Sequence, residues 1–447
     1  MPEHNFQFNW LGIPDQRRQL AEAMLFQFSQ TEKFPPEQLA QLQLAHLKNL
    51  VQHCLTHVPY YRNGEYFPIH NWQDWGRLPL LSRRALQDNS NTLRADINLE
   101  NRDGKVYEKR TSGSTGRPVK VLVSERNQVY WNANTIRDHL WQQRDFNHIL
   151  AVIKYQGQRH SAPPGQASRN WGAGTGTLYA TGPAVIISSS TPIDDQFDWL
   201  QKVRPGYLLT YPSLLRALAE KNLASNRPLQ LGSISTIGES LGPDTRELAR
   251  GAFGARVADI YSCQELGYMA LQCPRHDHYH VTAESSLVEV LDDNNRPCAP
   301  GEMGRVVVTA LHNRVMPLIR YDIGDYAIAG GSCDCGIRLP VLERVIGRTR
   351  NLVHYPDGSR SWPLYNAMKM MDLISGAQFQ LVQKTSDTLL LRIGTDTPVA
   401  EPTLQALKSI INEAIGYPFN ILFEQVADIP RSNSGKFEEF ISEMAPE

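Results

Sequence analysis

Several kinds of segment are missing from this sequence of 447 residues, and each absence excludes a class of protein. No apolar run reaches the roughly 18 residues that a membrane-spanning helix needs. Residues 1–20 lack the apolar centre of a signal peptide. Six cysteines in a chain of this length are too few for a disulfide scaffold. We therefore expect a cytoplasmic protein without a membrane span.

An excess of charge of one sign is also missing. The 45 basic and 46 acidic residues leave a formal net charge of −1. Neither a basic field nor a run of Lys and Arg indicates binding to nucleic acid or to a membrane surface. The chain has no internal repeats and no low-complexity tract, and it is too long for one hydrophobic core. We expect two or more globular domains.

The apolar spacing predicts an α/β architecture. Residues 15–60 have the periodicity of helices, and Ser82 is placed to cap a helix that follows 78–81. Between 125 and 260, helical and buried-strand patterns alternate, which is typical of parallel strands covered by helices. Strands are expected at 149–155, 182–188, 234–240 and 255–261, and helices at 197–203 and 212–223.

The character of the chain changes after residue 280. Alternating apolar residues indicate antiparallel β structure up to about 347, and a small α+β segment with a helix at 403–416 follows. We predict a large N-terminal domain, residues 1–346, and a small C-terminal domain, residues 347–447. The stretch 165–182 is rich in glycine and is expected to be a long loop, either for ligand contacts or as a mobile insertion.

Residues 111–121, TSGSTGRPVKV, have the composition of a phosphate-binding loop. Glycine permits tight turns and close approach of backbone N–H groups, while hydroxyls donate and a cation, Arg117 or Lys120, balances charge. The loop lies between two strand-like runs and lacks the Walker spacing. A polar surface turn is the alternative. The residues expected to hold phosphate are Ser112, Gly113, Ser114, Thr115, Gly116 and Lys120.

Four motifs follow this loop along the chain: YSCQE (261–265), RYDIGD (320–325), GRTRN (347–351) and PRSNSGK (430–436). With the loop, and in this order, they resemble the adenylate-forming superfamily of acyl-CoA synthetases, and most closely its branch of phenylacetate–CoA ligases and capsular polysaccharide biosynthesis proteins. The resemblance covers about residues 50–440. It implies a large domain and a small mobile one, hinged near 348–351, and ATP-dependent activation of a carboxylate with release of pyrophosphate.

The resemblance also implies roles for single residues. Glu265 would ligate Mg²⁺, which prefers oxygen ligands, although a surface carboxylate is the alternative. Asp325 would bind the ribose with Arg348 nearby, although Asp also favours turns. The other residues matched to the nucleotide site are Gly238, Glu239, Ser240, Asp259, Ile260, Tyr261, Ser262 and Gln264.

Lys436 is matched to the lysine that enters the active site during adenylation, where an ammonium stabilises negative charge. It belongs to the implied catalytic set, with Glu265, Ser114 and Thr115. The alternative is an exposed lysine near the terminus. Two positions depart from the family pattern: Gln264 replaces a hydroxyl, and Asn351 replaces the common Asp of the hinge. The second, thioester-forming step therefore depends on a substituted hinge.

Cys273, His280, Cys333 and Cys335 form a separate signal. Three thiolates and one imidazole suit a closed tetrahedral Zn²⁺ site, which would be structural because no position stays open for substrate. The resemblance supports this, since some members of the branch carry such a site. His276 and His278 are alternative ligands, and reduced, unliganded cysteines are the other possibility.

The substrate is expected in a pocket near the nucleotide. Its predicted residues are Tyr155, Trp171, Gly238, Tyr261 and Gly267. Aromatic side chains fit an aryl or arylacetic acid, but an amino, fatty or sugar acid stays open. The acceptor is CoA by resemblance, with a carrier protein or an amine as alternatives. An enzyme that stops after one half-reaction and a decayed scaffold are the other function classes, and a homodimer is one assembly left open.

Overall fold

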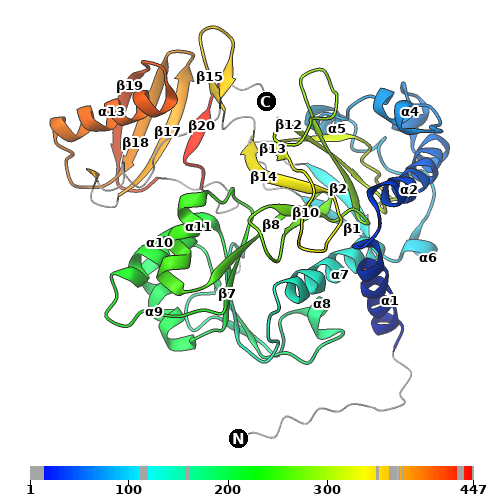
Figure 1. Ribbon diagram of the computed structural model, residues 1–447, viewed down its shortest axis with the longest axis horizontal. Helices are drawn as coiled ribbons and strands as arrows, with labels where there is room; N and C mark the ends of the chain where they lie inside the picture. Colours follow the sequence, from blue (N-terminus) through cyan, green and yellow to red (C-terminus); the bar gives the residue numbers. More distant parts are fainter. Residues whose placement is uncertain are drawn as a thin grey trace, which may run out of the picture. The chain divides into compact units, whose positions relative to one another are not determined.

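The computed structural model describes residues 15–110, 119–156, 161–348, 352–361, 370, 373–374, 377–429 and 437–444. The chain divides into two compact units, Met1–Ile346 and Gly347–Glu447 (Figure 1). Each unit has its own hydrophobic core and is described by itself. That the second unit moves about a hinge near 348–351 stays a prediction.

The first unit begins with helices, as the apolar spacing predicted. The helices are α1 (Gln16–Thr31), α2 (Pro36–His57), α3 (Pro59–Arg62), α4 (Trp72–Arg77), α5 (Arg83–Asp88) and α6 (Glu100–Asp103). The predicted cap of α5 is confirmed, because the Ser82 hydroxyl accepts a hydrogen bond from the Ala85 N–H at 3.1 Å. Such a bond satisfies one of the otherwise unpaired amides of a first helical turn.

A hairpin precedes the main sheet. Strands β1 (Val106–Arg110) and β2 (Lys120–Ser124) pair antiparallel, with Arg110 opposite Lys120, so both predicted strands around residues 111–118 are confirmed. Helix α7 (Glu125–Trp141) follows directly and begins with a capping box formed by Ser124 and Asn127. The hairpin therefore anchors the predicted phosphate-binding segment at both of its ends.

A sheet of twelve strands forms the centre of the first unit. Its parallel part runs in the order β5 (Ala184–Ser188), β3 (Leu150–Lys154), β6 (Tyr207–Thr210), β7 (Ser233–Ile237) and β8 (Arg256–Cys263). Helices α9 (Ile193–Val203), α10 (Pro212–Leu223) and α11 (Pro243–Phe253) connect these strands and lie together beside them in Figure 1. Apolar side chains such as Leu208, Ile234 and Leu215 fill the core between strands and helices. The α/β prediction is confirmed.

Antiparallel strands extend the sheet beyond β8, as the pattern after residue 280 predicted. They are β9 (Gly267–Gln272), β10 (Tyr279–Val281), β14 (Val341–Arg348), β13 (Tyr321–Ala329), β12 (Met303–Ala310) and β11 (Ser286–Leu291). The stretch 165–182 was predicted as one long loop, and this is wrong in part. It contains β4 (Gln166–Ser168), which pairs antiparallel with β5, and the helical turn α8 (Ala173–Gly176).

The second unit contains a four-stranded sheet in the order β19 (Asn420–Val426), β18 (Thr388–Gly394), β17 (Gln378–Thr385) and β20 (Phe440–Ser442), besides the short pair β15 (Val353–His354) and β16 (Arg360–Ser361). Helix α13 (Glu401–Ile415) confirms the predicted helix and buries Leu407 and Ile411 in the core of this unit. Among the described helices of both units, none has the length and apolar character that crossing a bilayer requires.

A buried arginine joins the first helix to the sheet. Arg137 of α7 is 2% exposed, and its guanidinium donates to both Glu284 carboxylate oxygens at 2.7 and 3.0 Å. It also lies 3.0 Å from the Glu32 carboxylate and stacks 3.9 Å from the centre of the Phe28 ring. Burial raises the pKa of the Glu32 carboxyl, and the Arg137 charge opposes that shift. One guanidinium therefore pairs with two carboxylates that have little access to water.

We expect Arg137→Met to lower the free energy of unfolding by about 3–5 kcal/mol, because removing one partner leaves buried carboxylates unpaired. The loss should shrink as the pH falls, since protonation removes the uncompensated charges. Urea denaturation at pH 8 and pH 5.5 measures both effects. The matched control is Arg18→Met, whose ion pair with Glu22 is exposed on α1 and should contribute less than about 1 kcal/mol. Equal effects of the two substitutions would contradict this account.

Candidate active site

The carboxyl ends of the parallel strands meet at one edge of the sheet, where open α/β sheets bind ligands. Tyr155 follows β3, and Gly238 follows β7 with φ +78°, a conformation that favours glycine. Tyr155 is 44% exposed, and its N–H donates to the Tyr211 hydroxyl at 3.1 Å. Ser240 is exposed beside them. These residues, predicted from distant parts of the sequence, lie at the same edge.

The Glu239 side chain is engaged by a helix. Its carboxylate accepts a hydrogen bond from the Ser213 N–H at 2.9 Å, in the first turn of α10. A carboxylate at a helix N-terminus is stabilised by the unpaired amides and by the helix dipole. This contact ties the segment 238–240 to the start of α10.

Two of the predicted nucleotide residues meet directly. The Tyr261 hydroxyl of β8 donates to the Asp325 carboxylate of β13 at 2.8 Å, although the residues are 64 positions apart in the sequence. The pairing of β8 with β9 shifts register between Tyr261 and Ser262, and such an irregularity redirects side chains. The YSCQE and RYDIGD motifs are therefore in direct contact.

Glu265 lies in the turn between β8 and β9. Its side chain is 8% exposed, and one carboxylate oxygen is 3.6 Å from the Arg83 guanidinium. Arg83 is the first residue of α5. The sequence analysis missed Arg83, because nothing in residues 82–84 indicated that this helix begins near residue 265. A carboxylate so shielded from water can bind a cation strongly.

A small pocket of about 30 Å³ adjoins Glu265. It lies between the β1–β2 hairpin, helix α7 and the turn after β8, and it contains Gln264 and Gly267 of the predicted set. Lys109, at the end of β1, also lines it and was missed by the sequence analysis, which considered only the cations within 111–121. The residues of this pocket are Lys109, Val123, Asn127, Tyr130, Trp131, Asn134, Gln264, Glu265, Leu266, Gly267, Tyr268, Ser285, Ala310 and His312.

Asp259 and Ile260, which are matched to the segment that holds adenine, have buried side chains. The Asp259 carboxylate is buried within β8 and accepts hydrogen bonds from the Thr236 hydroxyl at 2.5 Å and the Tyr279 hydroxyl at 2.8 Å. Burial raises the pKa of this carboxyl, and the two hydroxyls oppose the shift. Ile260 packs in a core cluster with Leu271. Both side chains are buried, and the predicted contact of this segment with adenine stays a prediction.

Trp171 is also a core residue. It is 7% exposed, its indole N–H donates to the His148 carbonyl at 2.9 Å, and its ring lies 5.3 Å from that of Tyr207. Tyr207 is the first residue of β6, so Trp171 lies towards the amino ends of the strands, away from Tyr155 and Gly238. We therefore remove Trp171 from the proposed substrate pocket. Aromatic composition alone could not separate these two environments.

Some predicted residues lie outside the described residues. They are Ser112, Gly113, Ser114, Thr115 and Gly116 of the phosphate-binding segment, Asn351 of the hinge, and Lys436. Arg348 ends β14, but its side chain is not described. Lys120 is described and exposed on β2. The roles of these residues stay predictions.

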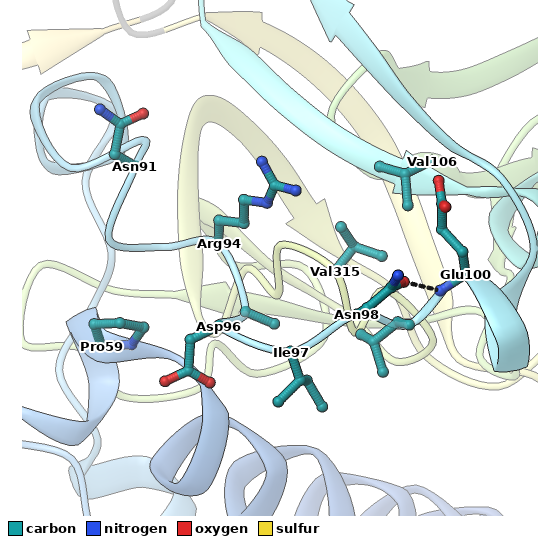
Figure 2. Close-up of a pocket in the computed structure, with 11 residues that line it drawn as sticks. Pro59, Asn91, Arg94, Asp96, Ile97, Asn98, Glu100, Val106 and Val315 are labelled. Carbon is teal, nitrogen blue, oxygen red and sulfur yellow. Dashed lines mark hydrogen bonds between the residues drawn. The ribbon is translucent and has the colours of Figure 1, made fainter.

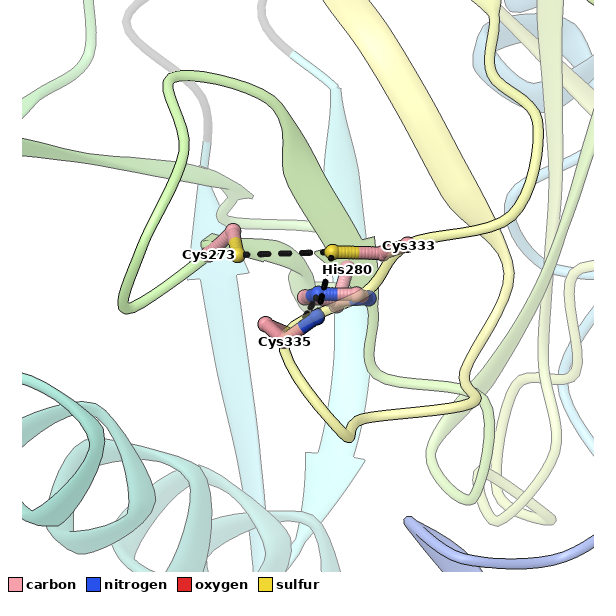
Figure 3. A group of neighbouring side chains, drawn as sticks. All are labelled: Cys273, His280, Cys333 and Cys335. Atoms are coloured by element: carbon pink, nitrogen blue, oxygen red, sulfur yellow. Dashed lines mark hydrogen bonds between the residues drawn. The ribbon is translucent and has the colours of Figure 1, made fainter.

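The predicted metal ligands converge. The side chains of Cys273, His280, Cys333 and Cys335 point towards one another from β10 and from two loops, and their ligand atoms all lie within 4.8 Å of one another (Figure 3). The Cys273 and Cys333 sulfurs are 3.8 Å apart, and the Cys335 sulfur is 3.3 Å from His280 Nε2. A tetrahedral ion with bonds of about 2.3 Å to sulfur would hold two sulfurs about 3.8 Å apart. The residues present fit such an ion.

The surroundings of this cluster orient its ligands. Backbone N–H groups of Arg275, Cys335 and Ile337 each donate to a cluster sulfur at 3.4 Å. His280 Nδ1 lies 3.3 Å from the Leu339 carbonyl, which leaves Nε2 directed at the cluster. Burial raises the pKa of the Cys335 thiol to about 12, so a bound cation would have to displace its proton.

The alternative histidines differ in their contacts. His276 Nε2 lies 2.5 Å from the Asp334 carboxylate, and it belongs to a second, more exposed group with Cys333 and Asp334. The His278 ring stacks on that of His276, and in the described part of the chain His278 belongs to neither group. His280 is fully buried beside the three sulfurs. The geometry therefore selects His280 among the three candidates.

A larger hollow of about 560 Å³ lies elsewhere in the first unit (Figure 2). Arg94, Asp96, Asn98 and Glu100 give it a polar lining, and the Asn98 side chain accepts a hydrogen bond from the Glu100 N–H at 2.8 Å. The Arg62 guanidinium neutralises Asp96 from outside this lining, at 3.0 Å. None of the predicted site residues that the structure describes lines this hollow. Size alone does not identify the active site.

Comparison with known proteins assigns both units. Residues 110–313 match the AMP-binding enzyme family, and residues 360–443 match the CapK C-terminal domain. The chain is similar to a phenylacetate–coenzyme A ligase of Thermus thermophilus, with 25% identity over 353 residues that cover 74% of each chain. It is also similar to a phenylacetate–coenzyme A ligase of Aromatoleum evansii, with 26% identity over 319 residues, or 66% of this chain and 67% of the relative.

Solved structures share the fold. A 2-hydroxyisobutyryl-CoA ligase in its postadenylation state superposes with a TM-score of 0.70 at 19% identity, covering 98% of this chain and 94% of that one. An anthranilate CoA ligase in complex with anthranoyl-AMP gives a TM-score of 0.51 at 13% identity, covering 74% and 64%. The predicted resemblance is confirmed. The chain is an AMP-forming ligase with an AMP-binding enzyme domain followed by a CapK C-terminal domain.

Proposed function

We propose that this ligase activates a carboxylic acid with ATP and then transfers the acyl group to the thiol of CoA. The observation that carries the proposal is the hydrogen bond from the Tyr261 hydroxyl to the Asp325 carboxylate, which joins the YSCQE motif, with Glu265 four residues further on, to the RYDIGD motif. The resemblance assigns both motifs to Mg²⁺·ATP. The names of the relatives, which are coenzyme A ligases, support the choice of acceptor.

The chemistry proceeds in two balanced steps. A carboxylate oxygen attacks the α-phosphorus of ATP, and the bond from that phosphorus to the bridging oxygen of pyrophosphate breaks. The CoA sulfur then attacks the carbonyl carbon of the acyl-adenylate, AMP leaves, and the thiol proton is released. The protein must position anionic reactants and compensate the charge in the first transition state.

The described residues divide this work. Asp325, held by the Tyr261 hydroxyl, would accept hydrogen bonds from the ribose. Glu265 would hold Mg²⁺, which supplies positive charge to the phosphates when bound. Gly238 gives the backbone of its segment close access to the ligand. Ser112, Ser114 and Thr115 would donate to the phosphates from the loop between β1 and β2.

The acid is proposed to be an aryl or arylacetic acid. Tyr155 offers exposed aromatic surface at the strand edge, and both relatives are named phenylacetate–coenzyme A ligases. A carrier protein or an amine is the alternative acceptor. The cytoplasmic location and the oligomeric state, a homodimer included, stay predictions.

Product analysis tests the function. The protein is incubated with ATP, Mg²⁺, CoA and phenylacetate or a related acid, and the products are separated by mass spectrometry. The proposal expects acyl-CoA, AMP and pyrophosphate in equal amounts. Acyl-adenylate without acyl-CoA would favour an enzyme that performs the first step only, for which the substituted positions Asn351 and Gln264 are the supporting features. Formation of ADP would contradict the mechanism.

We expect Lys436→Ala to slow adenylation by about 10²–10³-fold, since one preorganised group that stabilises transition-state charge contributes this much. The affinity for ATP and the melting temperature should change little. Single-turnover formation of the adenylate measures the rate. Lys408→Ala in α13 of the same unit is the control and should leave the rate unchanged. An unaltered adenylation rate in Lys436→Ala would refute the assigned role.

We also propose that Cys273, His280, Cys333 and Cys335 hold a structural Zn²⁺. The supporting observations are the sulfur separation, the three N–H donors and the oriented imidazole. Four protein ligands leave no open position, so the ion would join β10 to the loop of residues 330–340 and take no part in the reaction. Arg256 supports the first ligand loop, because its guanidinium donates to the carbonyls of Cys273 at 2.6 Å and His276 at 2.9 Å.

Cys335→Ala should release the metal and lower the melting temperature of the first unit, because binding energy at a structural site is folding energy. Metal content by mass spectrometry and thermal denaturation are the measurements. Cys298→Ala is the matched control, since this half-buried cysteine lies outside the cluster and should retain the metal. Native protein purified without chelator and containing no zinc would end the proposal.

A further inference from the structure

Lys109 occupies an unusual position for a lysine. It is the fourth residue of β1, opposite Val121 of β2, and its side chain is half-buried. Its ammonium lies 5.1 Å from the centre of the Trp131 ring on α7. A cation over an indole face is held in place without any anion. The side chain is therefore directed inward, towards helix α7, instead of into solvent.

The Lys109 side chain points towards the proposed nucleotide site. Lys109 lines the same small pocket as Gln264 and Glu265, between the hairpin, α7 and the turn after β8. Glu265 is the proposed Mg²⁺ ligand, and Gln264 occupies the position that the resemblance places near phosphate. In the sequence, Lys109 lies two residues before Thr111, where the phosphate-binding segment begins. The hairpin, helix α7 and the turn after β8 thus place this ammonium beside the residues that are proposed to contact Mg²⁺ and the phosphates.

Among the described residues, the Lys109 ammonium forms no ion pair, although the Glu265 carboxylate lines the same pocket and the Cys263 thiol lies near enough to raise the pKa of Lys109. No described carboxylate lies within 4 Å of Nζ, and no described group accepts a hydrogen bond from Nζ. The adjoining residues 111–118 contain neither Asp nor Glu. Burial lowers the pKa of Lys109, which reflects the cost of keeping its charge out of water. A desolvated cation without an anion destabilises the fold, and an anionic ligand would relieve that cost.

We propose that Lys109 contacts the β- and γ-phosphates of ATP, and hence the pyrophosphate that leaves. This proposal rests on the proposed function and adds a residue to it. The acyl group is expected beside Tyr155 and Gly238, at the ends of β3 and β7, and neither of these residues lines the pocket that contains Lys109, although Gly267 of the predicted substrate set does. A contact with the carboxylate substrate is therefore disfavoured, and the test separates the two anions.

The chain offers a matched control for this lysine. Lys105 precedes the same strand and its ammonium also lies over an aromatic ring, that of Tyr107 at 5.6 Å. Lys105 is exposed and does not line the pocket. The two lysines share residue type, hairpin and ring contact, and they differ in access to the pocket that contains Glu265.

ATP–pyrophosphate exchange measures the effect of Lys109→Met, Lys109→Arg and Lys105→Met. Lys109→Met should raise the KM values for ATP and for pyrophosphate by at least tenfold, while the KM for the acid changes less than twofold. Its melting temperature should not fall, because an unpaired half-buried charge is replaced by an apolar chain of similar length. Lys109→Arg keeps the charge and should retain most of the affinity, and Lys105→Met should behave as wild type.

The outcomes distinguish failure of the role of Lys109 from failure of the proposed function. If the wild type catalyses exchange and Lys109→Met has unchanged KM values for ATP and pyrophosphate, the role of Lys109 is overturned and the proposed function is not. If only the KM for the acid rises, Lys109 contacts the carboxylate substrate instead of the phosphates, and this result would also overturn the proposal. A fall in melting temperature in both Lys109 variants, without a selective change in either KM, would show a structural role. Absence of exchange in the wild type would refute the proposed function itself.

Discussion

The pairing of strand β8 with its two neighbours is the constraint on which the site depends. On one side β8 runs parallel to β7, so that the segments after both strands emerge at one edge of the sheet. On the other side it pairs antiparallel with β9, and the turn between them carries Gln264 and Glu265. A shift of one residue in this pairing would reverse the faces of Tyr261 and its neighbours. The local irregularity at Tyr261 and Ser262 sets the direction in which the Tyr261 hydroxyl meets Asp325.

The arrangement of charge follows from this geometry. Glu265 and Asp325 bring negative charge to a site whose ligand is itself a polyanion, so cations are required on the same side. Arg83 reaches Glu265 from the start of α5, and Lys109 reaches the adjoining pocket from the hairpin. These two residues come from elements that are far apart in sequence from the turn they approach. Charge compensation in the site is thus a property of the tertiary fold and is not contained in any one motif.

The cluster of Cys273, His280, Cys333 and Cys335, which we propose binds a metal, and the buried Arg137 connect separate elements of the first unit. The cluster of cysteines and His280 joins β10 to the loop of residues 330–340, and Trp141 places its ring edge-on to His280 at 5.8 Å. The Trp141 indole donates to Glu32, which Arg137 also contacts. A continuous set of packed and hydrogen-bonded groups therefore connects the first helix, α7 and the metal ligands.

Local patterns in the sequence predicted most of the strands, the cap at Ser82 and the four side chains that converge at Cys273, His280, Cys333 and Cys335, because periodicity, capping and ligand chemistry are short-range properties. The motifs also predicted that Tyr261, Glu265 and Asp325 share a site. They could not predict that Asp259 and Trp171 are buried, since burial depends on which elements pack together. Strand β4 and turn α8 were hidden within a glycine-rich stretch that lacks apolar alternation. Arg83 and Lys109 were missed for the same reason, because they lie close to Glu265 in space but far from it in the sequence.

The most direct test of the central claim is ATP–pyrophosphate exchange by the wild-type protein, without CoA, across a panel of aryl, aliphatic, amino and sugar acids. The account predicts exchange that depends on one class of acid and on Mg²⁺, because the reverse of adenylation returns labelled pyrophosphate to ATP. Binding of ATP without exchange in the presence of any acid, when product analysis also detects no adenylate, would contradict the claim that this site activates carboxylates.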